Sequence, residues 1–285
     1  MRLLATADLH FNHARSRPLA EDLIARMNRV DADVLLVIGD TAPADGDALE
    51  RCLALFDFPG PKLFVAGNHE LWTSGPDSHA LFKEDLPRRV RALGWHWLQD
   101  EPYVRDGIAI VGSLGWYDYS FASAKLGIPH RFYERKVSPG AAQRLSEFAS
   151  LLEPSDDIPP IAREIVARWN DGKHVKLHRS DAEFVAELIE QLDAQLSTVA
   201  ADRVVAAVHT LPFAELLPPC RHDQRDFAHA FLGSRRLGEL LLRFPKISHV
   251  LCGHSHMPAE VDIGHLTAIN IGSGYRWKLY RILEL

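Results

Sequence analysis

Five short apolar segments of this 285-residue chain each run into a residue that can bind a metal ion. The segments are residues 2–7, 34–38, 63–66, 204–208 and 248–252. They are followed by Asp8-Leu9-His10, Gly39-Asp40, Gly67-Asn68-His69-Glu70, His209 and Gly253-His254-Ser255-His256. Short apolar runs bounded by polar, glycine-containing loops are typical of buried β-strands. Any fold of this chain must therefore place five polar groups at the ends of buried strands.

Predicted helices separate the first three of these strands. Apolar residues recur at 3.6-residue spacing within residues 16–30, at Leu19, Leu23, Ile24, Met27 and Val30, and a second helix is predicted over residues 47–56. Alternation of strand and helix predicts an α/β fold with a parallel sheet covered by helices. Ligands bind beyond the carboxyl ends of the strands in such sheets, so the polar groups are expected to meet at one edge.

The segment from about residue 117 to residue 200 has few strand signals. A third helix over residues 78–93 and short strands at 96–98, 103–105 and 108–112 precede it, and strands at 261–263, 266–271 and 278–283 close the chain. Ser180 and Glu183 form a capping box that predicts the start of the last helix of this segment. We predict a single domain, residues 1–285, with a largely helical cap inserted at about 117–200.

Each polar group also has an ordinary structural explanation when it is taken alone. Asp-x-His is common in turns, Gly-Asp after a strand often caps a helix, and a histidine such as His209 often lies in a core or on a surface. The combination is harder to explain in this way, because buried carboxylates are unfavourable unless a cation balances them. Oxygen and imidazole ligands without thiolate suit Mn, Fe, Zn or Mg ions.

Taken in order, these motifs resemble those of the calcineurin-like metallophosphoesterase superfamily over residues 8–256. The resemblance implies a four-layer α/β/β/α sandwich of two facing mixed β-sheets flanked by helices, with a two-metal centre at one end. It implies the following ligands: Asp8, His10 and His256 for one metal ion, Asn68, His209 and His254 for the other, and Asp40 bridging both. His69 is not a ligand in that family and is expected to protonate the leaving oxygen, so His69 and Asp40 are the expected catalytic residues.

The sequence departs from the family pattern in two places. After Gly39-Asp40 it lacks the arginine and the second glycine of the protein Ser/Thr phosphatases, which disfavours that branch. His209 is followed by Thr210 and Leu211 rather than directly by His or Pro, so three other histidines stay open as alternatives: His222, His229 and His249. The acid that orients His69 is also left open, between Asp45 and Asp47.

Aromatic and basic residues are interleaved after residue 115. The candidate substrate contacts are Asn12, Trp116, Tyr117, His130 and Arg131. Such a pattern can stack on bases and hold phosphates, but it can equally pack the interior of a cap. We favour packing, because the segment is also rich in acids. Acidic residues outnumber basic ones by 38 to 32, and the net charge of −6 argues against binding nucleic acid by charge alone.

The predicted function is hydrolysis of a phosphate mono- or diester of a small molecule by a hydroxide that two metal ions activate, with Mn, Fe or Zn the most suitable. A nuclease or a cyclic-nucleotide phosphodiesterase is the alternative. A non-catalytic scaffold is less favoured, because every expected position is filled, including His69.

The expected location is the cytoplasm. The first apolar run stops at Asp8, too early for a signal peptide, and no run approaches the roughly 18 residues of a membrane span. Three widely spaced cysteines give no disulfide framework. The sequence predicts neither the physiological substrate nor the oligomeric state.

Overall fold

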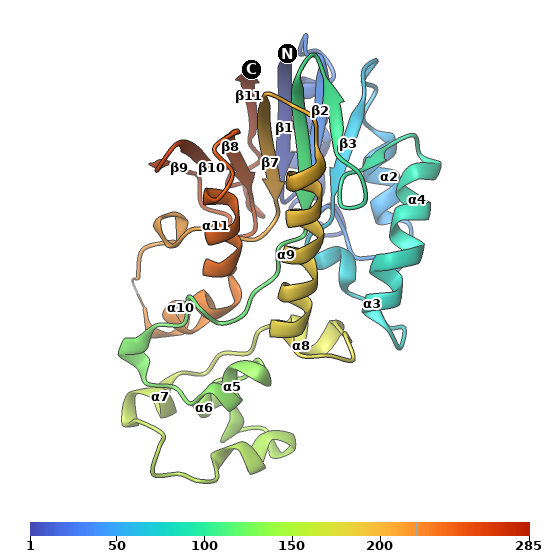
Figure 1. Ribbon diagram of the computed structural model, residues 1–285. Helices are drawn as coiled ribbons and strands as arrows, with labels where there is room; N and C mark the ends of the chain where they lie inside the picture. The colour runs from blue at the N-terminus through green and yellow to red at the C-terminus, as the bar shows by residue number, and fades with distance from the viewer. Residues whose placement is uncertain (221) are drawn as a thin grey trace.

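The computed structural model describes residues 1–220 and 222–285 and contains two β-sheets (Figure 1). The first sheet has the order β11-β1-β2-β3-β4, with β1 at Arg2–Ala7, β2 at Val34–Ile38, β3 at Lys62–Val65, β4 at His96–Trp97 and β11 at Tyr280–Glu284. The second has the order β5-β6-β7-β8-β10-β9, with β5 at Tyr103–Arg105, β6 at Ile108–Ser113, β7 at Arg203–Val208, β8 at Ile247–Cys252, β9 at Ala259–Ile263 and β10 at Leu266–Asn270. Both sheets are mixed, because β11, β5 and β9 pair antiparallel at edges of otherwise parallel sheets.

The two sheets pack face to face through alternate side chains. Leu3 and Ala5 of β1 share one buried cluster with Val205 of β7 and Leu251 of β8. Leu4 belongs instead to the cluster beneath the helices, because successive side chains of a strand point to opposite faces. Helices cover the outer face of each sheet. The predicted four-layer α/β/β/α sandwich is therefore confirmed.

Different helices cover the two outer faces. The first sheet is covered by α1 (Arg17–Met27), α2 (Ala48–Ala54) and α4 (Leu86–Ala92), and a π-helical turn at Leu81–Asp85 joins α3 (Ser78–Ala80) to α4. The second is covered by α9 (Asp181–Thr198) and α11 (Arg235–Leu242). The predicted helix over residues 78–93 is thus three consecutive helical segments.

The chain between β6 and β7 forms the segment predicted as an insertion. Its helices are α5 (His130–Glu134), α6 (Pro139–Ala142), α7 (Pro160–Glu164), α8 (Asp171–His174) and α9. Figure 1 shows α5, α6 and α7 away from the two sheets, at the end opposite the chain termini, with α10 (Asp223–Ala228) beside them. The predicted capping box opens α9, which runs back beside the second sheet.

The chain termini lie side by side at the other end of the sandwich. The Met1 amino group donates to the Leu285 carbonyl over 2.9 Å, and β11 pairs antiparallel with β1. Because β10 and β11 belong to different sheets, the chain between them crosses from one sheet to the other. This crossing brings residues 271–279 beside the carboxyl end of β1.

Candidate metal centre

The carboxyl ends of β1, β2, β3, β7 and β8 carry the predicted polar groups. Five of these residues have left-handed backbone: Asp8 (φ 56°), His10 (44°), Asp40 (53°), His254 (67°) and His256 (57°). Residues other than glycine rarely adopt this conformation, and neighbouring structure has to hold it. Hydrogen bonds between the loops do so: Asp8 N–H donates to the Gly39 carbonyl over 3.0 Å and His10 N–H to the Asp40 carbonyl over 2.8 Å.

Glycine precedes several of these residues because a side chain would not fit. A Cβ atom on Gly253 would lie 2.5 Å from Asp8 Oδ2, and one on Gly39 would lie 2.6 Å from the Gly67 backbone nitrogen. Gly39 also has a φ of 67°, which favours glycine. The glycines in the motifs therefore permit close approach of the loops that carry the ligands.

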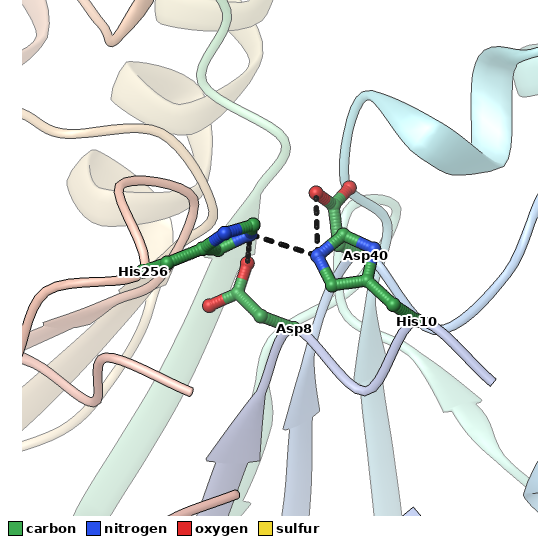
Figure 2. A group of neighbouring side chains, drawn as sticks. All are labelled: Asp8, His10, Asp40 and His256. Carbon is green, nitrogen blue, oxygen red and sulfur yellow. Dashed lines mark hydrogen bonds and ion pairs between the residues drawn. The ribbon is translucent and has the colours of Figure 1, made fainter. Parts of the chain in front are cut away.

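The first group of potential ligands contains Asp8, His10, Asp40 and His256 (Figure 2). Each offers one ligand atom, and these atoms lie within 4.8 Å of one another. His10 Nε2 lies 2.8 Å from His256 Nε2 and 3.8 Å from Asp40 Oδ2, and His256 Nε2 lies 3.7 Å from Asp8 Oδ1. Four side chains from three strand ends thus converge on one point.

The second group contains Asp40, His209 and His254, again within 4.8 Å. His209 Nε2 lies 3.2 Å from Asp40 Oδ1 and 3.3 Å from Asn68 Oδ1. The other ring nitrogen, Nδ1, donates to the Ile38 carbonyl, and His254 Nε2 donates to the Phe231 carbonyl. A carbonyl only accepts, so each bond places a hydrogen on the bonded nitrogen and turns the second ring nitrogen toward the group, where it could bind a metal ion. All seven predicted ligands lie together, and Asp40 belongs to both groups.

Both groups fit metal ions. Buried Asp8 Oδ2 and His254 Nδ1 have no hydrogen-bond partner within the described chain. A buried polar atom without a partner costs about 1–3 kcal/mol, and a cation would remove that penalty. Carboxylate, amide and imidazole ligands suit Mn, Fe or Zn ions, and a shared carboxylate lets two ions lie close together.

Burial keeps three of the imidazoles in the neutral form that binds metals. Desolvation lowers the pKa of His254 to about 4 and the pKa of His256 to about 3. It also lowers the pKa of His10 well below its ordinary value. Neutral imidazole has a lone pair for a metal ion, whereas imidazolium has none.

The two carboxylates of the centre differ in their charge. Desolvation raises the pKa of Asp8 to about 7. Burial acts on Asp40 in the same direction, but the surrounding imidazoles, His209 first, hold the pKa of Asp40 well below its ordinary value. In turn, Asp40 overcomes the effect of burial on His209 and raises the pKa of His209 to about 9. Asp40 is therefore the ionised carboxylate at the middle of the centre.

His69 lies beside the two groups and faces the cavity described below. Its backbone N–H donates to Asp40 Oδ1 over 3.0 Å, and its Nε2 lies 3.7 Å from Asp40 Oδ2. The ring stacks on Trp72 with centroids 3.8 Å apart. Asp45, one of the acids considered for orienting His69, accepts hydrogen bonds from Thr73 and Ser74 instead. His69 Nδ1 has no hydrogen-bond partner among the described residues. Trp72, not a carboxylate, therefore fixes the plane of the His69 ring.

Glu70 is a structural residue of the centre that the sequence analysis did not single out. Its carboxylate is wholly buried and accepts four backbone N–H groups, from Asp40, Thr41, Ala42 and Gly67, over 2.6–3.1 Å. Glu70 therefore ties the loop after β2 to the loop after β3. Its place directly after His69 was the only signal in the sequence.

We expect Glu70→Gln to lower the free energy of unfolding of the metal-free protein by about 2–4 kcal/mol. Each carboxylate oxygen of Glu70 accepts two N–H groups, and an amide would turn its own N–H₂ toward two of these donors. Urea denaturation measures the change. Exposed Glu21 is the matched control, and Glu21→Gln should stay within about 0.5 kcal/mol of the parent. Equal stability of the two variants would contradict this role.

Two residues of the segment 271–279, which crosses between the sheets, contact the first ligand group. Lys278 Nζ donates to the Asp8 carbonyl over 2.6 Å, and burial lowers the pKa of Lys278 to about 8. The Tyr275 ring stacks on the His10 ring with centroids 4.4 Å apart. Neither contact follows from local sequence, because both depend on the pairing of β11 with β1.

Asp171 of α8 is a further unpredicted residue beside the centre. Its wholly buried carboxylate accepts hydrogen bonds from Asn68 Nδ2, Trp72 Nε1, Tyr117 Oη and Trp169 Nε1, at 2.9, 2.6, 2.9 and 2.7 Å respectively. The insertion therefore contacts the metal centre directly.

A cavity of about 660 Å³ opens over the two groups, a size common for small-molecule sites. One part of its wall is formed by residues of the centre, among them Asp40, His69 and His254. The rest includes aromatic and basic side chains: Trp72, Trp169, Tyr275, Trp277, Arg168 and Arg225. The Tyr275–Trp277 segment is thus part of the cavity.

The predicted substrate contacts lie elsewhere. Within the described chain, the cavity wall includes none of Asn12, Trp116, Tyr117, His130 and Arg131. Trp116 and Tyr117 are wholly buried and donate to acids of the insertion. Arg131 donates hydrogen bonds to Asp157 and to the Leu151 carbonyl. His130 pairs with Glu134 on the surface. Packing within the cap, the interpretation favoured from the sequence, describes Trp116, Tyr117 and Arg131, whereas His130 lies on the surface.

The alternative histidines do not join either group. His222 is exposed, and His249 Nδ1 bonds the Ser248 hydroxyl. His229 belongs to a third group whose ligand atoms lie within 4.8 Å, together with Cys220 and Asp226, and it lines the cavity. His209 is the histidine that the structure places next to Asp40 and Asn68.

Buried acid–imidazole groups at the strand ends of such a sandwich define a candidate metal-binding site. The sequence matches the family model described as calcineurin-like phosphoesterase over residues 1–258. The chain belongs to this family, which confirms the resemblance seen in its motifs. A search of curated proteins finds no match.

Two solved structures are similar to this chain, and the first of them shares its fold. The phosphopantetheinyl hydrolase of Mycobacterium tuberculosis is 19% identical, with a TM-score of 0.67 over 96% of this chain and 89% of that one. A dimetal phosphatase from Danio rerio is 14% identical, with a TM-score of 0.49 over 99% of this chain and 91% of that one. In the described residues every helix is too short or too polar to span a bilayer.

Proposed function

We propose that this chain is a two-metal phosphoesterase that hydrolyses a phosphate mono- or diester of a small molecule. The proposal rests on the two ligand groups that share Asp40 beneath the cavity. Asp8, His10 and His256 would hold one ion, Asn68, His209 and His254 the other, and Asp40 both. Mn, Fe or Zn ions suit these ligands. Two such metal ions would polarise the phosphoryl oxygens as Lewis acids and would lower the pKa of a bound water molecule for attack on phosphorus.

The role proposed for His69 is to give a proton to the leaving oxygen. An alkoxide is a poor leaving group unless it is protonated, so an imidazole beside it has a specific task. His69 faces the cavity, and its ring is held by Trp72 while its backbone bonds Asp40. These contacts fix the ring next to the centre without making it a ligand.

The cavity supports a small substrate with an apolar or planar part. Aromatic rings such as Trp169 and Trp277 line it, and Arg168 and Arg225 offer positive charge for a second anionic group. A nuclease needs a long basic groove, which suits the net charge of −6 poorly. We keep a nuclease or cyclic-nucleotide phosphodiesterase as the alternative. We further propose that about residues 117–200 act as a cap within a single domain; a cytoplasmic location stays a prediction.

The first experiment compares p-nitrophenyl phosphate with bis-p-nitrophenyl phosphate as substrates. Metal-stripped protein is refilled with Mn²⁺, Zn²⁺, Mg²⁺ or Ni²⁺ before the assay. Metal-dependent turnover supports the proposal, and the preferred ester separates monoesterase from diesterase. Because the solved relative is named a phosphopantetheinyl hydrolase, a phosphopantetheine ester belongs in the panel as well. A chain that binds two ions and hydrolyses no ester in the panel would contradict the proposal.

Metal ions should also stabilise the fold. A site filled at a free Mn²⁺ concentration of about 100 times its Kd adds about 2.7 kcal/mol to the free energy of unfolding. We expect this increase for each of two sites in urea denaturation, and we expect EDTA to reverse it. Ca²⁺ is the control, because it prefers all-oxygen ligands. A chain whose stability does not respond to Mn²⁺, Zn²⁺ or Fe²⁺ would refute a metal centre.

A further inference from the structure

We infer that Asp171 of the insertion is a positioning residue for the second metal group, because it fixes the orientation of the Asn68 amide. The inference rests on the metal centre proposed above. It makes the insertion part of the metal site as well as a cover over the cavity.

The four hydrogen bonds to Asp171 are divided equally between its two oxygens. Oδ1 accepts from Asn68 Nδ2 and Trp72 Nε1, and Oδ2 accepts from Tyr117 Oη and Trp169 Nε1. An indole N–H can only donate, so each oxygen of residue 171 must accept. A carboxylate meets this requirement, whereas an amide of the same size does not. The arrangement therefore specifies Asp rather than Asn at this position.

The consequence for Asn68 concerns which end of its amide faces the centre. Because Oδ1 of Asp171 only accepts, it selects the Nδ2 end of the Asn68 amide. The carbonyl oxygen of Asn68 is then turned toward His209 Nε2, 3.3 Å away, and toward the second group. Rotation of the amide by half a turn would present its N–H₂ group to the cation, and an amide N–H₂ group cannot bind a cation. Carboxylates that orient histidine ligands act in the same way.

Trp72 extends this control to His69. The indole of Trp72 donates to the same Asp171 oxygen as Asn68 does, and its ring stacks on His69. One buried carboxylate therefore fixes a metal ligand directly and the proposed proton donor through one intermediate ring.

Calorimetric titration of metal-free protein with Mn²⁺ tests the inference. Asp171→Asn should weaken the second ion by about 10- to 100-fold, the usual effect of removing such a carboxylate. The first ion, at Asp8, His10 and His256, should stay within about threefold. Tyr117→Phe is the matched control: it removes a hydrogen bond to the other oxygen of Asp171 and leaves the contact with Asn68. Affinity for the second ion should then stay within about threefold.

A double-mutant cycle separates positioning from general loss of packing. If Asp171 acts through Asn68, adding Asp171→Asn to Asn68→Ala should change the affinity for the second ion by less than about twofold. Additive effects, equal weakening of both ions, or wild-type affinity in folded Asp171→Asn would each overturn the inference. If Asp171→Asn does not fold, hydrogen exchange in the wild-type chain tests the inference. The side-chain N–H₂ signals of Asn68 are assigned by NMR through their absence in Asn68→Ala. These hydrogens should exchange slowly with solvent, and rapid exchange overturns the inference. Because no turnover is measured, a chain that binds two ions but hydrolyses no ester refutes the proposed activity alone.

Discussion

Replacing Asp40 with asparagine is expected to lower metal-dependent ester hydrolysis by at least about 10³-fold and to remove tight binding of both ions. Asp40 belongs to both ligand groups, and it is the carboxylate whose pKa the surrounding imidazoles hold well below its ordinary value. The amide is neutral, so nothing at the middle of the site would then balance the charge of two close cations. Metal analysis of dialysed protein and steady-state assays measure the two effects.

Asp45→Asn is the control for this variant. Asp45 follows Asp40 by five residues but bonds Thr73 and Ser74 outside the centre, so we expect two bound ions and near-normal turnover. Asp8→Asn gives an intermediate case, because Asp8 belongs to the first group only, and it should lose the first ion selectively. Asp40→Asn protein that keeps two ions and more than a tenth of its activity would remove Asp40 from its bridging role.

The gathering of polar groups at the strand ends could be predicted because it depends on local order and one general rule, whereas the set of ligands came from the resemblance to a known family. An apolar run predicts a buried strand, and the carboxyl ends of parallel strands meet at one edge. The residues that follow β1, β2 and β3 therefore meet at one edge of the first sheet, and those that follow β7 and β8 meet at one edge of the second. The second sheet came from the resemblance to a known family, since the pattern of strands does not say how they divide between sheets.

The residues that support the ligands could not be predicted in this way. Asp171 lies 103 positions from Asn68 and Lys278 lies 270 positions from Asp8, so no local pattern connects either pair. Tyr117 and Arg131 illustrate the opposite problem. Their pattern suits a binding surface as well as a packed cap, and only burial distinguishes the two. Left-handed backbone at Asp8 and Asp40 is likewise imposed by neighbouring loops, because their own residue types do not require it.

Replacing His69 with glutamine is expected to have an effect that depends on the leaving group. For an alkyl phosphate ester, whose leaving oxygen needs a proton, turnover should fall by about 10²- to 10⁴-fold. For a p-nitrophenyl ester, whose leaving group departs as a stable anion, the loss should stay below about tenfold. His69 lies outside both ligand groups, so the variant should still bind two ions. The measurement is kcat for a series of esters with increasing pKa of the leaving alcohol.

The slope of log kcat against that pKa distinguishes a proton donor from a residue that only shapes the site. Loss of a proton donor makes the slope steeper, whereas misplacement of the substrate lowers every rate by the same factor. His13→Gln is the control: exposed His13 also lies beside His10 and Tyr275, and its loss should leave the slope unchanged. Parallel slopes in the parent and His69→Gln would assign His69 to positioning, and loss of an ion would make it a ligand. Only a steeper slope with both ions retained is consistent with a histidine that is stacked on Trp72 and donates a proton into the cavity.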